Sequence, residues 1–258
     1  MYHFIVIGNP INHSKSPAIH TAFARAVGLD IRYHRQFCPD DMDSFTAVVE
    51  AFFNGGGTGA NVTLPFKEMA FELCQNVGTL SNHAKKAGAV NTLAIKDDKL
   101  YGDNTDGRGL VADLTDKGVD LQGKKVAILG AGGATRGAIL PLLEAGAVVS
   151  VYNRTLTKAQ ALAQDFDVSA HALDELTGHF DIIINATSAT TTGQHLDLQG
   201  VSADVAYDMM YGKSSEFLTH FKTAKQIDGT GMLINQAKLS FELWTEQMVD
   251  LSNVVLDL

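Results

Sequence analysis

Short apolar runs alternate with segments of helical periodicity along the whole chain. The apolar runs of the first hundred residues are predicted strands, at 4–8, 31–37, 59–63 and 90–95. Segments with apolar residues three and four positions apart lie between them and are predicted helices, at 17–27, 40–53, 65–74 and 79–87. The charged turn "KDDK" predicts a hairpin that returns the chain to "LYGDNTDG". Strands and helices in alternation predict an α/β sheet.

A more regular repeat begins after Gly123. Four almost wholly apolar runs follow, at 124–130, 147–153, 181–185 and 204–209. Such runs are typical of parallel strands that are covered on both faces. Helical segments separate most of them, at 135–145, 157–166 and 214–225. We therefore predict an α/β domain over 1–106, completed by a C-terminal helical segment at 236–258, and a doubly wound Rossmann-type domain over 107–235.

Composition and charge narrow the class of protein. The chain has 258 residues, of which 45% are hydrophobic and 19% charged, as in ordinary globular proteins. Its net charge is −9 and its basic residues form no block, which argues against nucleic-acid or membrane-surface binding. "MYHFIVIGNP" has neither the charge nor the length of a targeting or membrane segment. Cys38 and Cys74 have no metal-ligand spacing. We expect a cytoplasmic protein with reduced thiols and no metal site.

A glycine-rich turn follows the first strand of the second domain, in "VAILGAGGATRGAIL" (126–140). Gly130, Gly132 and Gly133 let the backbone approach a pyrophosphate, which binds to the N–H groups of the following helix. The usual dinucleotide pattern has its third glycine where this chain has Thr135, and Gly137 comes two positions later. The alternative interpretation is a tight strand-to-helix turn without a ligand.

The next predicted strand ends in "VYNRT", with Asn153, Arg154 and Thr155. NAD sites usually have an acidic residue here for the ribose 2′-hydroxyl. An arginine instead makes charge-assisted hydrogen bonds to a 2′-phosphate. The position therefore predicts NADP as the cofactor, with a solvated loop arginine as the alternative.

Polar residues gather in four clusters of the first domain, whose members are Ser14, Ser16, Asn61, Thr63, Lys67, Asn91, Asp103, Asn104 and Asp106. Single members have structural alternatives: Ser16 as a helix N-cap before Pro17, Asn91 as a turn residue, Asp106 as a favourable charge at a helix start. Taken together, hydroxyls and amides suit a ligand with several hydroxyl groups. A lone lysine and a lone aspartate suit proton transfer.

Lys67 has an unusual predicted position. Pro65 is predicted as the first residue of a helix, so Lys67 lies on its first turn. A cation there is mildly unfavourable, because the positive end of the helix dipole is close. This favours a catalytic role for Lys67 over a stabilising one.

The chain resembles the shikimate dehydrogenase family. The segments "GNPINHSKSPAIH", "ANVTLPFK", "GAVNT", "GDNTDG", "GAGGATRG", "NRT", "NATS", "YDMMY" and "GTGMLINQ" occur in that family's order and spacing, over nearly the whole chain. The resemblance implies NADPH-dependent reduction of 3-dehydroshikimate to shikimate, in the pathway to aromatic amino acids. It also implies a substrate domain, a Rossmann-type NADP domain and a C-terminal segment that returns to the first.

The resemblance also implies roles for individual residues. Lys67 and Asp106 correspond to the catalytic pair. Substrate hydroxyls and carboxylate would be bound by Ser14, Ser16, Asn61, Thr63, Asn91, Tyr211 and Gln236. NADP would be bound by Gly130, Ala131, Gly132, Gly133, Ala134, Asn153, Arg154, Thr155, Thr187, Met209 and Gly229. Two of these have structural alternatives: Gln236 as a satisfied buried amide and Met209 as ordinary core.

Two positions depart from the family pattern. Three threonines precede Gly193 after "NATS", where the family usually has a small glycine-containing turn, and Asn82 stands where many members have an acidic residue. Two alternatives stay open, a broader quinate/shikimate dehydrogenase that uses NAD and a dinucleotide-binding relative without catalysis. The sequence leaves open whether the protein is a monomer or a homodimer.

Overall fold

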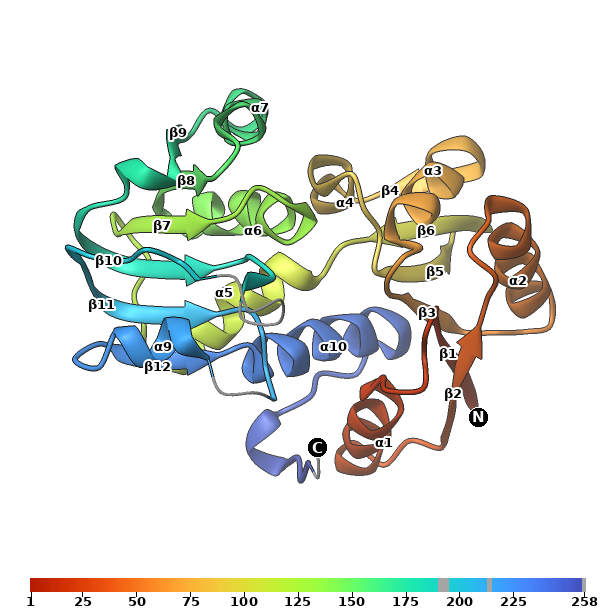
Figure 1. Cartoon of the computed structure of the whole chain (residues 1–258). Helices are drawn as coiled ribbons and strands as arrows, with labels where there is room; N and C mark the ends of the chain where they lie inside the picture. The colour runs from red at the N-terminus through yellow and green to blue at the C-terminus, as the bar shows by residue number, and fades with distance from the viewer. Residues whose placement is uncertain (190–194, 213–214, 257–258) are drawn as a thin grey trace. The chain divides into compact units, whose positions relative to one another are not determined.

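The chain forms two compact units in a computed structural model that describes residues 1–189, 195–212 and 215–256 (Figure 1). Unit 1 comprises Met1–Thr105 and Gln236–Leu258, and unit 2 comprises Asp106–Asn235. The sequence placed the first boundary one residue later, after Asp106. No helix among the described residues has the length and apolar character needed to cross a membrane.

Unit 1 is built on a mixed sheet of six strands in the order β2-β1-β3-β5-β6-β4. β1 pairs in parallel with β2 and β3, β5 is antiparallel to β3 and β6, and β4 is parallel to β6. Its elements are β1 (Tyr2–Gly8), α1 (Ser16–Ala26), β2 (Ile31–Phe37), α2 (Met42–Asn54), β3 (Gly59–Val62), α3 (Lys67–Val77), β4 (Gly78–Leu80), α4 (Asn82–Ala87), β5 (Thr92–Lys96) and β6 (Lys99–Asp103).

Alternate residues of β1 enter two separate cores, because successive side chains of a strand point to opposite faces. Ile5 and Ile7 pack with residues of α2 and α3. Phe4 and Val6 pack on the other face with Trp244, whose indole Nε1 donates to the Leu93 carbonyl at 3.0 Å. A Cβ on Gly59 would lie 2.4 Å from that indole, so this strand position accepts only glycine without a shift of the tryptophan.

Unit 2 is built on an all-parallel sheet of six strands in the order β12-β11-β10-β7-β8-β9. Its elements are α5 (Asp106–Asp116), β7 (Lys125–Leu129), α6 (Gly133–Glu144), β8 (Val148–Asn153), α7 (Leu156–Phe166), β9 (Ser169–Ala172), η1 (Leu173–Glu175), β10 (Gly178–Asn185), β11 (Val201–Asp208), α9 (Glu216–His220) and β12 (Lys225–Asp228). Chain order reverses between β7 and β10, which is the doubly wound arrangement predicted from the sequence.

Both faces of this sheet are buried. Val126 and Ile128 of β7 join one core, and Ala127 and Leu129 join the core on the opposite face. This explains the uninterrupted apolar runs in the sequence. Helix α10 (Thr230–Thr245) begins in unit 2 and ends in unit 1, followed by the short helix η2 (Leu251–Asn253), so the chain does return to the first unit.

Several local predictions were wrong. Pro65 is not helical: Phe66 N donates to Thr63 O across a turn, and α3 begins at Lys67. The structural alternative for Ser16, a helix N-cap, does not hold either, because Ser16 is the first residue of α1 and Lys15 occupies the cap position. The C-terminal helix ends at Thr245, because Glu246 adopts a left-handed backbone conformation with φ +56°.

Other elements were missed because they are short or polar. Helix α5 was not predicted, and neither were the strands β4, β9 and β12. The predicted helix at 79–87 is β4 followed by α4, and the predicted helix at 214–225 is only α9. The hairpin between β5 and β6 was correct, and its turn has positive φ at Asp97 and Asp98.

Candidate active site

The serine loop of unit 1 lies between β1 and α1. The Ser14 hydroxyl donates to Ser16 Oγ at 3.2 Å and also accepts from the Ser16 N–H at 3.3 Å. Arg35, on the edge strand β2, donates twice to the Ser14 carbonyl, at 2.7 and 3.1 Å. Both hydroxyls are half-buried at the N-terminus of an 11-residue helix. Hydroxyls and helix N–H groups together suit an anionic group such as a carboxylate.

Asn61 lies at the end of the buried strand β3 and is 6% exposed. Its Oδ1 accepts from the Tyr33 phenol at 2.7 Å. Its Nδ2 donates to the Asn91 carbonyl, Thr92 Oγ1 and Ser240 Oγ, at 3.1 to 3.4 Å. The amide is therefore held from both sides.

Asn91 is the second buried amide, 2% exposed, directly before β5. Its Oδ1 accepts from the Thr105 N–H and from Thr92 Oγ1, both at 2.9 Å. Its Nδ2 donates to Thr105 Oγ1 at 2.8 Å and to Gln236 Oε1 at 3.3 Å. These bonds join three of the predicted substrate residues, Asn61, Asn91 and Gln236, into one hydrogen-bonded network within unit 1. The structural alternative for Gln236 was a buried amide with satisfied hydrogen bonds. Its amide is hydrogen-bonded, but the residue is only half-buried.

The two residues of the predicted catalytic pair, Lys67 and Asp106, are each the first residue of a helix. The Lys67 carbonyl accepts from the Val90 N–H at 2.8 Å, next to Asn91. Asp106 is the first residue of α5, directly after Thr105. Thr63 precedes α3 and is half-buried, its N–H bonded to the Ile7 carbonyl at 3.0 Å. Nearby, Asp103 accepts from Ser81 Oγ at 2.5 Å and from the Asn104 N–H at 2.8 Å, which gives it a turn-building role.

Sequence reasoning missed several members of the network. They are Tyr33, Thr92, Thr105 and Ser240, which are all at most 9% exposed. Thr92 and Thr105 belong to quoted motifs, and Ser240 lies a few residues after another. Attention to the hydroxyl residues within the motifs would therefore have identified Thr92 and Thr105. Tyr33 lies in a predicted strand but in none of the quoted motifs, and its part in the site needs the β2–β1–β3 arrangement to be known.

The glycine turn of unit 2 connects β7 to α6. Gly130 has φ +107°, a conformation that favours glycine, and a Cβ there would make a tight contact of 3.1 Å with Thr187 Cγ2. Thr135, in place of the third glycine, is buried and donates to the Gly130 carbonyl at 2.9 Å. The third glycine of the usual pattern allows close packing of the helix that follows the turn. In this chain the close packing is at Gly107 instead, where a Cβ would lie 2.1 Å from the Gly137 carbonyl oxygen.

A cavity of about 670 Å³ lies beside this turn, within unit 2. Seven predicted cofactor residues line it, namely Gly130, Ala131, Gly132, Asn153, Arg154, Thr155 and Thr187. Arg154 and Lys158 are exposed cations at the end of β8 and on the first turn of α7. The cavity therefore combines a backbone turn for a pyrophosphate with positive charge for a further phosphate. Gly133 and Ala134 form the adjoining start of α6.

The loops after β10 and β11 are tied together by Asp208, which is fully buried. Its carboxylate accepts from Asn185 Nδ2 at 3.2 Å, from the Met210 N–H at 3.0 Å and from Ser215 Oγ at 2.5 Å. Asn185 in turn accepts from the Thr187 hydroxyl at 2.7 Å. This fixes Thr187 at the carboxyl edge of the sheet.

Met209 and Gly229 meet at the same edge. A Cβ on Gly229 would lie 2.2 Å from the Met209 carbonyl oxygen, so glycine permits this contact. Tyr211 is 42% exposed in the loop after β11. Asn82 is the exposed first residue of α4. The threonines before Gly193 lie outside the described residues.

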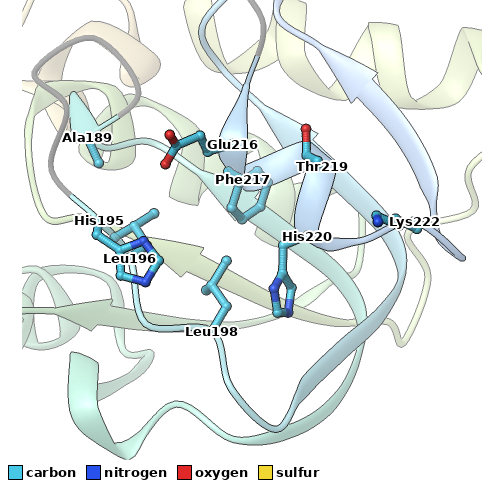
Figure 2. A pocket seen from close by; sticks show the side chains of 9 residues that line it. All are labelled: Ala189, His195, Leu196, Leu198, Glu216, Phe217, Thr219, His220 and Lys222. Atoms are coloured by element: carbon cyan, nitrogen blue, oxygen red, sulfur yellow. The ribbon is translucent and has the colours of Figure 1, made fainter.

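A second, smaller cavity of about 340 Å³ lies on unit 2 beside α9. Figure 2 shows Phe217 and His220 of α9 facing Leu196 and Leu198 across it. It shares Ala189, His195 and Leu196 with the larger cavity. Its lining includes neither the glycine turn nor Arg154, so the larger cavity is the candidate for the dinucleotide.

The parallel sheet, the glycine turn at its reversal point and the basic cavity define unit 2 as a dinucleotide-binding domain of an oxidoreductase type. Comparison with known proteins identifies the family. Residues 6–93 match the shikimate dehydrogenase substrate binding domain, residues 113–196 match shikimate / quinate 5-dehydrogenase, and residues 229–254 match the shikimate 5′-dehydrogenase C-terminal domain.

Individual relatives agree with these matches. The chain is 52% identical to the shikimate dehydrogenase (NADP(+)) of Psychrobacter cryohalolentis, over 97% of this chain and 95% of that protein. A crystal structure of an Ael1 enzyme from Pseudomonas putida has a TM-score of 0.90 at 38% identity, covering 98% and 96% of the two chains. Shikimate 5-dehydrogenase from Thermus thermophilus, in complex with NADP(H) and shikimate, has a TM-score of 0.85 at 31% identity, covering 98% and 97%.

The chain belongs to the shikimate dehydrogenase family, and its activity is that of an NADP-dependent shikimate dehydrogenase in the shikimate pathway. The resemblance seen in the sequence is thereby confirmed, as are the enzyme class, the cofactor and the two α/β folds.

Proposed function

We propose that unit 1 binds shikimate through its hydrogen-bonded network and that unit 2 binds NADP. The observation that supports the first part is the set of neutral amides and hydroxyls around Asn61 and Asn91, which suits a ligand with several hydroxyl groups. Ser14 and Ser16, at the N-terminus of α1, would take the carboxylate. The other proposed substrate contacts are Asn61, Thr63, Asn91, Tyr211 and Gln236.

We propose Lys67 and Asp106 as the catalytic pair. NADPH, when bound, supplies the hydride that reduces the ketone of 3-dehydroshikimate. Lys67 stabilises the developing alkoxide and donates its proton to it. Asp106 holds the ammonium of Lys67 in position, and the reverse reaction returns the proton to Lys67.

Residues of the larger cavity would hold the cofactor. The glycine turn with Ala131 and Ala134 would bind the pyrophosphate. Asn153, Arg154 and Thr155 would bind the 2′-phosphate, an assignment that the cation at position 154 and the lack of an acidic residue there support. Thr187, Met209 and Gly229 would lie along the nicotinamide side. The alternative, an NAD-dependent quinate/shikimate dehydrogenase, would need an acidic residue at the end of β8, and none is present there.

We place the reaction in the cytoplasm on the basis of the two cysteines. The two cysteines, Cys38 and Cys74, are buried free thiols, and burial raises the pKa of Cys74 to about 12. Such thiols are unreactive and fit a reducing compartment.

Substitution of Lys67 tests the catalytic proposal. Lys67→Ala removes the proton donor, so kcat should fall by about 10² or more, while KM for shikimate changes less. Lys85→Ala, which removes an exposed lysine of α4, is the control and should keep the wild-type kcat. Initial rates are read from absorbance of the reduced nicotinamide. An unchanged kcat in Lys67→Ala would contradict the proposal.

A further inference from the structure

Tyr33 connects groups that the proposed function assigns to the substrate, although no sequence motif contains it. It lies on the edge strand β2 and is 9% exposed. Its phenol donates to Asn61 Oδ1 at 2.7 Å. Ser16 acts on the same phenol, since its side chain opposes the rise in pKa that burial gives Tyr33. The phenol is therefore bonded directly to the first amide.

The register of the sheet explains this placement. Phe4 of β1 pairs with Tyr33, and Val6 pairs with both Arg35 and Asn61. Paired residues of neighbouring strands share a face, so Tyr33, Arg35 and Asn61 lie on one face of the sheet. From that face Arg35 holds the Ser14 carbonyl while Tyr33 holds the Asn61 amide.

Aromatic contacts fix the ring of Tyr33. Its centroid lies 4.6 Å from that of His20, with 26° between the planes, and 6.1 Å from that of Phe4. His20 also stacks on Trp244 at 5.3 Å. His20 lies one helical turn after Ser16, so the helix that begins at the serine also supports the ring of Tyr33.

The hydrogen bonds of Asn61 define what it can offer a ligand. Its Nδ2 already faces three acceptors, at 3.1 to 3.4 Å. Its Oδ1 has two lone pairs, of which the Tyr33 phenol uses one. Neither ring nitrogen of the nearby His20 has a hydrogen-bond partner among the described residues, so the second lone pair of Oδ1 remains as the acceptor that a substrate hydroxyl would meet as donor. The phenol bond is the shortest bond of this amide, and it is the one that holds Oδ1.

We propose that Tyr33 is a positioning residue for shikimate, acting through Asn61. It fixes the Asn61 amide so that Oδ1 directs its second lone pair to a substrate hydroxyl. This inference rests on the proposed function, in which Asn61 contacts the substrate. Tyr33 itself needs no contact with the substrate.

Tyr33→Phe removes the phenol oxygen and keeps the stacked ring. Loss of one buried hydrogen bond predicts a KM for shikimate about tenfold higher, with kcat and KM for NADP within about twofold of wild type. Tyr2→Phe is the matched control, because Tyr2 lies on the adjacent strand β1 and also stacks on Phe4. It should leave all three parameters unchanged.

A double-mutant cycle shows whether Tyr33 acts through Asn61. Asn61→Ala should raise KM for shikimate, and Tyr33→Phe added to Asn61→Ala should change KM by less than about twofold. Additive effects, or a Tyr33→Phe enzyme that melts earlier but keeps its KM, would overturn the inference alone. A wild-type KM in Asn61→Ala would instead overturn the proposed role of Asn61, and the inference with it.

Discussion

In unit 1 two proposed substrate amides are buried within one hydrogen-bonded network, whereas in unit 2 several proposed cofactor residues are exposed. Asn61 and Asn91 are 6% and 2% exposed, and both the oxygen and the nitrogen of each amide have hydrogen-bond partners. Gly132, Arg154 and Thr155 are exposed. Neutral hydroxyls can be distinguished only by hydrogen bonds of fixed direction, which a rigid network provides. A phosphate is recognised mainly by charge and backbone N–H groups, so exposed positions suffice.

This difference predicts that binding and stability are separable in unit 2 and linked in unit 1. Arg154→Ala should raise KM for NADP by about 10- to 100-fold, because charged hydrogen bonds to the 2′-phosphate are lost. KM for NAD and the melting temperature should stay near wild type. Lys125→Ala, at another exposed basic residue of unit 2, is the control. An equal loss with NAD would show that Arg154 does not recognise the 2′-phosphate.

In unit 1 the stability should depend on pH through His20. Burial lowers the pKa of His20 to about 3, against an ordinary value of 6.5, although Asn61 acts in the opposite direction. The unfolded chain therefore binds a proton below pH 6.5 that the folded chain does not, and stability falls as the pH drops from 6.5 towards 3. Between pH 7 and pH 5 the loss is about 2 kcal/mol.

Urea unfolding at the two pH values measures this loss. Trp244, the one tryptophan of the chain, stacks on His20, so its fluorescence reports unfolding at this place. His20→Phe should reduce the loss by most of that amount, while His13→Phe, at an exposed histidine, should not. An identical pH dependence in His20→Phe and wild type would contradict the neutral state of His20.

The smallest expected effect concerns Ser240, a fully buried member of the network. Its hydroxyl contacts Thr92 Oγ1 at 2.7 Å, Asn61 Nδ2 at 3.1 Å and the Gln236 carbonyl at 3.1 Å. Ser240→Ala should lower the free energy of unfolding by about 1 kcal/mol and raise KM for shikimate by a few-fold, because both depend on the same bonds. Ser252→Ala, at an exposed serine of unit 1, should change neither. A change in stability without a change in KM would separate the network from the substrate.

The sequence predicted the division into two units, but not the buried network that distinguishes unit 1. Periodic apolar runs indicated the parallel sheet of unit 2, because strands buried on both faces show no polar alternation. Short elements such as β4 and β12 were missed, since three or four residues carry too little pattern. The turn at Pro65 was taken for a helix start because proline suits both.

The site was predictable where a local motif carries the chemistry. Gly130 and Arg154 follow strands at characteristic intervals, so sequence alone indicates them. Tyr33 and Ser240 act through partners 28 and 179 residues from them in the chain. Only the strand register and the return of α10 to unit 1 bring such residues together, and single-chain periodicity contains neither.

A two-by-two set of Michaelis constants tests the division of binding between the units most directly. KM for shikimate and KM for NADP are measured in Asn61→Ala and in Arg154→Ala, with the wild-type enzyme as reference. We expect Asn61→Ala to raise KM for shikimate alone and Arg154→Ala to raise KM for NADP alone. If either variant raises the other constant as much as its own, the units do not divide the two ligands as proposed.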